Sequence, residues 1–248
     1  MNKNTDIRQL PLAFEHQPFL GKEDFMVASC NAEAFAYVEN WPDWPFFAVC
    51  LYGPAGCGKS HLAHMFSDNV SVKTRYPYKI PRVRASEVGT ETLRLFEQHP
   101  CLIVEDMNDN IDNEAMFHLY NQYRNENGYI LFTSEIAPAR LRIALPDLRS
   151  RLNIVPSVEI REPNDELLQA LIVKLFNDRQ VVISQEVLNY IIANMQRSYA
   201  FARKLVAETD SISLARKRAV TIPIVKEALA VLNDDHQGEL FKLYDRKN

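Results

Sequence analysis

The chain has 248 residues, of which 47% are hydrophobic and 24% charged, as is typical of a globular protein with one large domain or a core and a small companion. Its net charge of −4 disfavours binding of nucleic acid over the whole surface, although the basic segment 215–220 could act locally. No run reaches the roughly 18 apolar residues of a membrane helix, and no basic and apolar leader opens the sequence. We therefore expect neither export nor membrane insertion.

The four cysteines indicate a reducing compartment. Cys30, Cys50, Cys57 and Cys101 form no CxxC pair and lack the histidine spacing of zinc sites. Binding of a metal through sulfur is thus disfavoured, and we expect a cytoplasmic protein.

The first patterned segment is the tail RQLPLAFEH, residues 8–16, which has four apolar residues beside a proline. Two interpretations are open. The tail could pack Leu12 and Phe14 on its own core, which these residues alone favour, or its spaced apolar side chains could enter a groove on a partner. A proline-stiffened, extended segment loses less entropy on docking, and buried anchors supply most of the energy of such an interface.

Helix and strand patterns alternate over the next part of the chain. Helical spacing begins at Ala32, with Ser29 or Asn31 placed to cap the helix. Short apolar runs predict buried strands at residues 46–52, 101–106 and 128–135. This alternation predicts an α/β fold, in which a parallel sheet has helices on both faces.

Beyond about Pro163 only helical patterns occur. Apolar residues recur at three and four spacing over residues 164–179, 184–196, 200–217 and 222–233. This part of the chain is therefore predicted to form a small all-α domain.

The stretch GPAGCGKS, residues 53–60, matches the P-loop pattern between a predicted strand and a predicted helix. Its three glycines allow a tight turn whose amide N–H groups point at phosphate oxygens, helped by the positive end of the following helix. Lys59 adds a positive charge for the outer phosphates, and the Ser60 hydroxyl is placed to bind magnesium. A simple glycine turn is the alternative, which the strand and helix context disfavours.

Polar side chains end the second and third predicted strands. Glu105 and Asp106 follow CLIV, where one acid would hold magnesium while its neighbour orients an attacking water. Thr133 and Ser134 end the next strand and could reach the γ-phosphate, or be ordinary surface hydroxyls. Solvated helix caps are the alternative for the two acids.

The segment ALPDLRSRLN, residues 144–153, has two arginines in a predicted turn or helix. Because Arg149 and Arg151 are two residues apart, they do not share a helix face. One could therefore support the fold while the other projects toward a neighbouring molecule.

Together these motifs resemble a known family. The order GPAGCGKS, LIVED, LFTSE and LPDLRSRL, followed by a helical domain, is similar to the AAA+ ATPase domain of the bacterial replication initiator DnaA over residues 20–232. Only residues 233–248 follow, too few for the DNA-reading domain of DnaA, so the chain resembles the Hda/HdaA family for regulatory inactivation of DnaA. The tail, the turn WPDWP and residues 218–229 add to this resemblance.

The resemblance implies an AAA+ P-loop core at residues 21–162, a lid at 163–232 and tails at 1–20 and 233–248. It implies ADP or ATP with Mg²⁺ as cofactors, and the sliding clamp (beta subunit of DNA polymerase III) and DnaA as partners. DNA would be contacted indirectly or weakly, and no contact with a membrane is implied. Whether the chain forms a homo-oligomer is left open. The function implied is negative regulation of replication initiation, in which an arginine finger stimulates ATP hydrolysis by DnaA.

The resemblance also assigns roles to residues of this sequence. Arg151 would be the arginine finger acting in trans, Asp106 the acid that orients water, and Ser60, Glu105 and Asp106 the magnesium ligands. The clamp-binding hexapeptide QLxLxF is represented by Gln9, Leu10, Leu12 and Phe14. The expected nucleotide contacts are Asn31, Gly53, Pro54, Ala55, Gly56, Cys57, Gly58, Lys59, Ser60, His61, Thr133 and Arg197.

Two departures from the family pattern bear on activity. The strand-end pair is Glu-Asp where many AAA+ enzymes have Asp-Glu, so we expect at most weak intrinsic hydrolysis and leave open whether the chain is itself an enzyme. The lid arginine is not clearly placed, since an ungapped match lands on Ala200, and Arg197 is preferred over Arg203. The alternatives are a DnaA-like initiator or helicase loader acting on DNA, and a stand-alone P-loop enzyme such as a small-molecule kinase.

Overall fold

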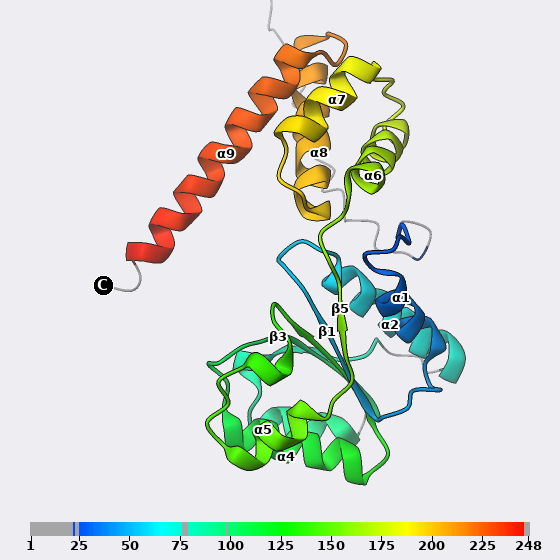
Figure 1. Cartoon of the computed structure of the whole chain (residues 1–248), viewed down its shortest axis with the longest axis vertical. Helices are drawn as coiled ribbons and strands as arrows, with labels where there is room; N and C mark the ends of the chain where they lie inside the picture. The colour runs from blue at the N-terminus through cyan, green and yellow to red at the C-terminus, as the bar shows by residue number, and fades with distance from the viewer. Residues whose placement is uncertain (1–21, 23–24, 76–78, 98, 246–248) are drawn as a thin grey trace, which may run out of the picture.

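A five-stranded parallel sheet forms the centre of the core (Figure 1). The computed structural model describes residues 22, 25–75, 79–97 and 99–245, so the tail motif at residues 9–14 lies outside the described part of the chain. Every neighbouring pair of strands in the order β2-β3-β4-β1-β5 is parallel, which confirms the predicted sheet. The strands are β1 (Ala48–Tyr52), β2 (Arg82–Arg84), β3 (Cys101–Met107), β4 (Tyr129–Ser134) and β5 (Ser157–Glu159).

The three strands predicted from apolar runs are the central ones, β1, β3 and β4. The two edge strands, β2 and β5, were not predicted. Each has three residues and places only its middle side chain toward the interior, so neither shows the apolar run by which a buried strand is recognised.

Strand residues alternate between the two faces of the sheet, and helices cover both faces. On β4, Ile130 and Phe132 belong to one apolar cluster and Leu131 to the other. The helices α1 (Ala32–Asn40) and α2 (Lys59–Thr74) pack on the Leu131 side. The helices α4 (Asn113–Asn125) and α5 (Pro146–Asn153) cover the opposite side, and the short α3 (Thr90–Leu93) contacts α4.

The lid consists of four helices with their own apolar cluster, as predicted. They are α6 (Asp165–Asn177), α7 (Gln185–Asn194), α8 (Tyr199–Arg216) and α9 (Ile222–Asp245). Side-chain oxygens of Asn164, Ser184 and Ser198 accept hydrogen bonds from the first turns of α6, α7 and α8. Because α9 continues to Asp245, residues 233–245 belong to this helix and do not form the separate tail that we expected.

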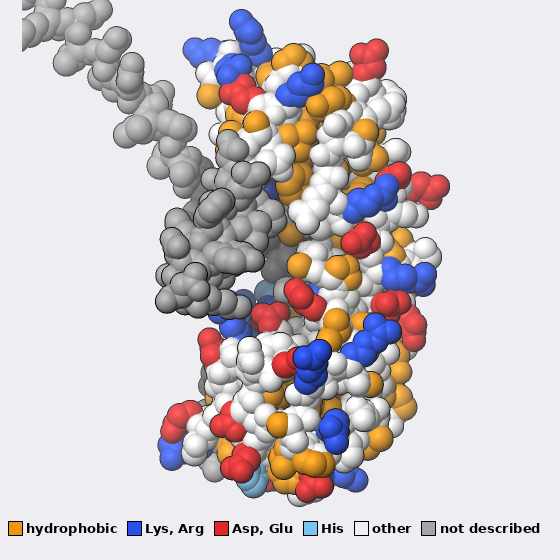
Figure 2. All heavy atoms as spheres, turned by 60° about the vertical axis from the view of Figure 1, so that its left-hand side comes forward, with side chains coloured by type: hydrophobic (Ala, Val, Ile, Leu, Met, Phe, Trp, Pro, Cys, Tyr) orange, Lys and Arg blue, Asp and Glu red, His pale blue; other side chains and the backbone are white. Residues whose placement is uncertain are grey.

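The surface shown in Figure 2 has basic and acidic side chains interspersed over both the core and the lid. No large area of one sign stands out on the described part of this face, in keeping with the small net charge. None of the described helices combines the length and the apolar character that crossing a lipid bilayer requires.

We predict that Leu131→Ala lowers the free energy of unfolding by about 3 kcal/mol, because it leaves a cavity in the centre of the sheet. The Leu131 side chain is fully buried, whereas Val182 is 88% exposed and provides the control substitution Val182→Ala. Urea unfolding followed by circular dichroism measures both. Equal stability of the two variants would contradict this account of the core.

Candidate functional site

The P-loop joins β1 to α2 and is held tightly by its neighbours. A Cβ atom at Gly53 would lie 2.0 Å from the carbonyl oxygen of Ile160, so only glycine fits there. The Gly53 N–H donates to Ser134 O at 3.2 Å, which ties the start of the loop to the end of β4. Gly56 has φ +74°, a conformation that glycine adopts at little cost. These contacts fix the loop at the carboxyl edge of the sheet.

Lys59 lies buried inside this loop. Its Nζ donates to the carbonyl oxygens of Gly53 at 2.6 Å and Pro54 at 2.8 Å, and lies 3.8 Å from the Sγ of Cys57. A buried ammonium group needs such partners, since burial without them is costly. The loop thus presents a positive charge together with the N-terminus of α2, an arrangement suited to phosphate.

A cavity of about 370 Å³ lies beside the P-loop, between the core and the lid. It has an apolar part and a charged part, which suits a ligand with a flat ring system and an anionic group. The residues around it are Phe25, Met26, Ala55, Gly56, Gly58, Lys59, Ser60, His61, Asp106, Glu135, Leu171, Tyr199, Ala200 and Arg203.

The two strand-end acids have different surroundings. Asp106 lines the cavity, and its backbone N–H donates to the Thr133 hydroxyl at 3.2 Å. Glu105 is instead bound by Arg82 of β2, at 2.6 and 3.3 Å. An irregularity of the β3–β4 pairing between Val104 and Met107 accompanies this difference. The structure therefore brings Asp106, and not Glu105, to the cavity.

Thr133 is buried and acts on the site through the backbone of Asp106. Ser60 and Asp106 both line the cavity and provide oxygen ligands of the kind that Mg²⁺ prefers. In the part of the chain that the structure describes, no three His, Cys, Asp or Glu side chains form a metal cluster. A magnesium ion here would take its other ligands from phosphate and water.

Asn31 is buried at the junction of core and lid. Its Oδ1 accepts from the N–H of Ala28 at 2.8 Å, and its Nδ2 donates to Met26 O at 2.9 Å and to the Tyr199 hydroxyl at 3.1 Å. It stands at the N-terminus of α1 without a side-chain capping bond. Asn31 does not line the cavity. It instead holds the segment that includes Met26, and Met26 lines the cavity.

The lid contributes one arginine to the cavity. Arg203 of α8 lines it, whereas Arg197 lies before α8 and pairs with Asp165 at 2.7 Å, with both side chains of the pair half exposed. The structure thus does not bring Arg197, the arginine preferred from the sequence, to the other predicted contacts. The physical reason is the place of each residue relative to α8: Arg197 precedes the N-cap Ser198 and pairs with Asp165 at the surface, whereas Arg203 lies one turn inside the helix.

Arg151 lies on α5 and points toward α4. Its guanidinium group stacks over the ring of Phe117 at 4.7 Å and donates to the side chain of Asn121. The Arg151 carbonyl oxygen accepts from the Tyr120 hydroxyl at 3.3 Å. Arg151 does not line the cavity of its own chain, and Arg149 beside it is exposed.

Several cavity residues were missed by sequence reasoning. Phe25 and Met26 precede the first predicted helix, and Glu135 is the last residue of the predicted strand 128–135 but was given no role. Leu171 and Tyr199 lie in the lid, where the apolar pattern predicts helices and not which face meets the core, whereas Arg203 was the less preferred candidate there. The spacing of Tyr199 and Arg203 by four residues, one helical turn, is a signal that could have grouped them.

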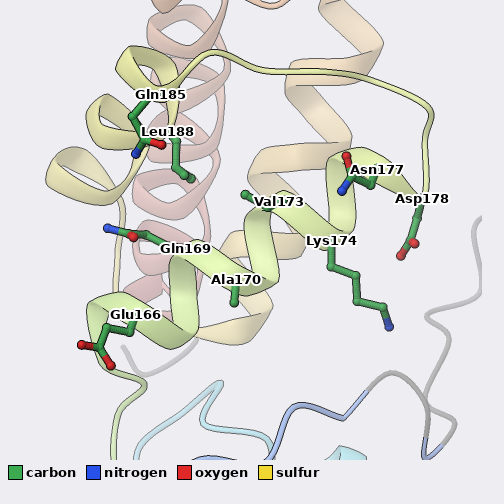
Figure 3. Close-up of a pocket in the computed structure, with 9 residues that line it drawn as sticks. All are labelled: Glu166, Gln169, Ala170, Val173, Lys174, Asn177, Asp178, Gln185 and Leu188. Carbon is green, nitrogen blue, oxygen red and sulfur yellow. The ribbon is translucent and has the colours of Figure 1, made fainter.

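A larger hollow, about 730 Å³, lies between α6 and α7 on the outer side of the lid (Figure 3). Glu166 and Lys174 at its rim point to opposite sides and do not converge on a common point. It has neither a glycine loop nor a helix N-terminus with a buried cation among its lining residues. The cavity beside the P-loop is therefore the candidate site.

Two family models match parts of the chain. Residues 165–229 match the model described as Hda, lid domain, which covers most of the four lid helices. Residues 49–140 match a model described as RNA helicase, a range that includes the P-loop and the strand ending in Asp106.

Similar sequences include an uncharacterized protein of Haemophilus influenzae and DnaA proteins. The former is 27% identical over 190 residues, which are 75% of this chain and 81% of that protein. The chromosomal replication initiator protein DnaA of Borrelia turicatae is 25% identical over 244 residues, which are 88% of this chain. The chain spans 50% of the length of that DnaA.

Solved structures of DnaA share the fold. Domain III of the Thermotoga maritima replication initiation protein DnaA has a TM-score of 0.73 at 18% identity, covering 88% of this chain and 97% of that one. The AMPPCP-bound DnaA from Aquifex aeolicus has a TM-score of 0.65 at 18% identity, covering 92% and 74%. The fold is thus that of an AAA+ core followed by a helical lid, as expected.

We predict that the thiols of Cys50 and Cys101 resist alkylation in the folded protein. Burial raises the pKa of both to about 12, so at pH 8 only about 1 in 10,000 of each thiol is ionised. Iodoacetamide at pH 8, with peptide mass spectrometry, should therefore modify the half-buried Cys30 first. All four should react in urea, and rapid modification of Cys50 or Cys101 without urea would contradict the prediction.

Proposed function

We propose that this chain, an AAA+ protein related to DnaA and Hda, is a nucleotide-bound regulator of replication initiation that stimulates ATP hydrolysis by DnaA. The observation that carries the proposal is the separation of two features on one chain. The cavity beside the P-loop has the groups needed to bind a nucleotide, while Arg151 lies outside it, on α5. Because Arg151 does not contact the nucleotide site of its own chain, we infer that it acts at the nucleotide site of a partner.

Binding of ADP or ATP is supported by the chemistry of the cavity. The loop amides, Lys59 and the N-terminus of α2 would hold the phosphates, and the apolar part with Phe25 and His61 would hold the base. Arg203 would contact the outer phosphates from the lid. Mg²⁺ would be held by Ser60 and Asp106 together with phosphate oxygens and would neutralise phosphate charge.

Weak intrinsic hydrolysis fits the acid available at the strand end. Asp106 is shorter by one methylene than the glutamate usual at that place, and Glu105 is held by Arg82. A positioning group that is displaced by about 1 Å can cost roughly a hundredfold in rate. The nucleotide would therefore have mainly a structural role in this chain: bound between the lid and the core, it would hold the two together.

The role of Arg151 follows from what an arginine finger does. Its guanidinium would stabilise charge on the phosphoryl group that is transferred in a partner's site, an effect on the order of a thousandfold or more. Its contacts with Phe117 and Asn121 would hold the side chain in an ordered position until the partner binds. Ordering beforehand lowers the entropy lost on docking.

Recruitment to the sliding clamp is the second part of the proposal, and it rests on the sequence of the tail. Gln9, Leu10, Leu12 and Phe14 match the QLxLxF pattern, and a proline stiffens the segment. Clamp on DNA would bring the chain and DnaA together in the cytoplasm, with DNA contacted indirectly.

We predict that Lys59→Ala abolishes tight binding of ADP and ATP, and that Arg203→Ala weakens binding of ATP by about 10-fold or more. A cation that contacts phosphate contributes a charge-assisted hydrogen bond, and Lys59 is buried while Arg203 is half-buried. Arg197→Ala is the matched control, since Arg197 pairs with Asp165 at the surface of the lid and should leave binding unchanged. Isothermal titration calorimetry measures all three. An effect of Arg197→Ala larger than that of Arg203→Ala would refute the assignment.

We predict that the chain accelerates hydrolysis by ATP-bound DnaA only with clamp on DNA present, and that Arg151→Ala removes the acceleration. Arg149→Ala, on the same helix, is the matched control and should retain it. Release of inorganic phosphate from purified proteins measures the rate.

Because Arg151 also contacts α4, circular dichroism should establish that Arg151→Ala is folded, and Arg151→Lys tests the guanidinium with the charge kept.

The double variant Gln9→Ala, Leu12→Ala should lose clamp binding with an unchanged melting temperature. No acceleration by the wild type under any nucleotide condition would refute the proposed function.

A further inference from the structure

Tyr199, the first residue of α8, contacts two other parts of the chain that meet at the cavity, the P-loop and the segment before α1. Its backbone N–H donates to the carbonyl oxygen of Gly56 in the P-loop at 3.0 Å. Its hydroxyl accepts from the Nδ2 of Asn31 at 3.1 Å. Its ring forms part of the cavity wall, where a Cβ atom at Gly58 would lie 3.9 Å from it.

The bond to Gly56 uses a group that a helix leaves without a partner. The N–H groups of the first turn have no intrahelical acceptor. In α8 the Ser198 side chain accepts from Phe201, and the loop carbonyl accepts from Tyr199. The approach is close, since a Cβ atom at Gly56 would lie 2.8 Å from that of Ser198. The start of α8 therefore lies directly on the P-loop.

The bond to Asn31 joins the lid to the segment on the other side of the cavity. Asn31 also holds Met26 and Ala28, so the phenol of Tyr199 is connected to the wall that Met26 provides. Burial raises the pKa of the Tyr199 phenol, which keeps the hydroxyl neutral at physiological pH. The donation from Asn31 by itself favours the phenolate, but burial and the neighbouring Cys30 outweigh it.

We propose that Tyr199 is a clasp that closes the lid over the nucleotide and determines how long the nucleotide stays bound. The proposal rests on the nucleotide site proposed above and concerns release from that site. With the clasp formed, the lid is joined to the segment 25–31 beside the cavity, so movement of the lid away from that segment requires the bond between Asn31 and Tyr199 to break. Arg203 lies one turn further along the same face of α8, so the clasp also positions Arg203 toward the phosphates.

The experiment measures release of the fluorescent nucleotide mant-ADP by stopped flow after mixing with excess ADP. Tyr199→Phe keeps the ring and the backbone bond to Gly56 and removes only the hydroxyl. We expect release about 2- to 10-fold faster, the factor that the loss of one hydrogen bond gives. Tyr190→Phe, in α7 and away from the cavity, is the matched control and should release at the wild-type rate.

A double-variant cycle separates the clasp from a purely structural role of the tyrosine. In an Asn31→Ala background the hydroxyl has lost its bond to the amide and keeps only its contact with Cys30, so Tyr199→Phe should accelerate release less than it does in the wild-type background. If Tyr199 had only a structural role, Tyr199→Phe would lower the melting temperature, and its effect on the release rate would add in full to the effect of Asn31→Ala. Equal release by wild type and Tyr199→Phe, with normal mant-ADP affinity, would overturn the clasp alone. Failure of the wild type to bind mant-ADP would overturn both the clasp and the nucleotide site.

Discussion

The close approach between Gly53 and Ile160 is the constraint on which the site depends. The P-loop can begin where it does only because position 53 lacks a Cβ atom that would collide with Ile160 O, 2.0 Å away. The N–H of Ile160 also donates to Tyr52 O at 2.7 Å, and the next residue, Arg161, donates to Cys30 O at 3.0 Å. The chain that leads to the lid thus passes between the P-loop and the segment before α1. Loop, opening segment and lid connection are positioned by one set of backbone contacts.

Sequence reasoning recovered what depends on local pattern. The glycine spacing identified the P-loop, apolar runs identified the three central strands, and helical periodicity identified the four lid helices. It could not choose between Glu105 and Asp106, because that choice depends on an irregularity of the pairing between β3 and β4. Nor did it find Tyr199, whose role comes from contacts with residues more than one hundred positions away in the chain.

The choice between Arg197 and Arg203 illustrates the same limit. Both are cations near the start of α8, and the sequence offers no means to tell which faces the core. The answer depends on how α8 packs against the core, which brings Arg203 to the cavity and leaves Arg197 beside Asp165 at the lid surface. A long-range ion pair of this kind leaves no periodic trace in the sequence. Local signals define elements, while side-chain roles at a domain junction follow from packing.

Asn31 limits how far core and lid can be regarded as separate modules. Its side chain is 1% exposed, and its Nδ2 donates to a core carbonyl and to a lid hydroxyl. A lid excised at residue 165, where the matched lid model begins, would lose the acceptor of the Tyr199 N–H, and the remaining core would lose a partner for a buried amide. In the separate pieces water can replace these partners, but when a foreign core buries the groups without partners, each costs about 1–3 kcal/mol. Recombination of this lid with a foreign core would therefore require that the core supply matching groups at both positions, a requirement that restricts domain exchange within this fold.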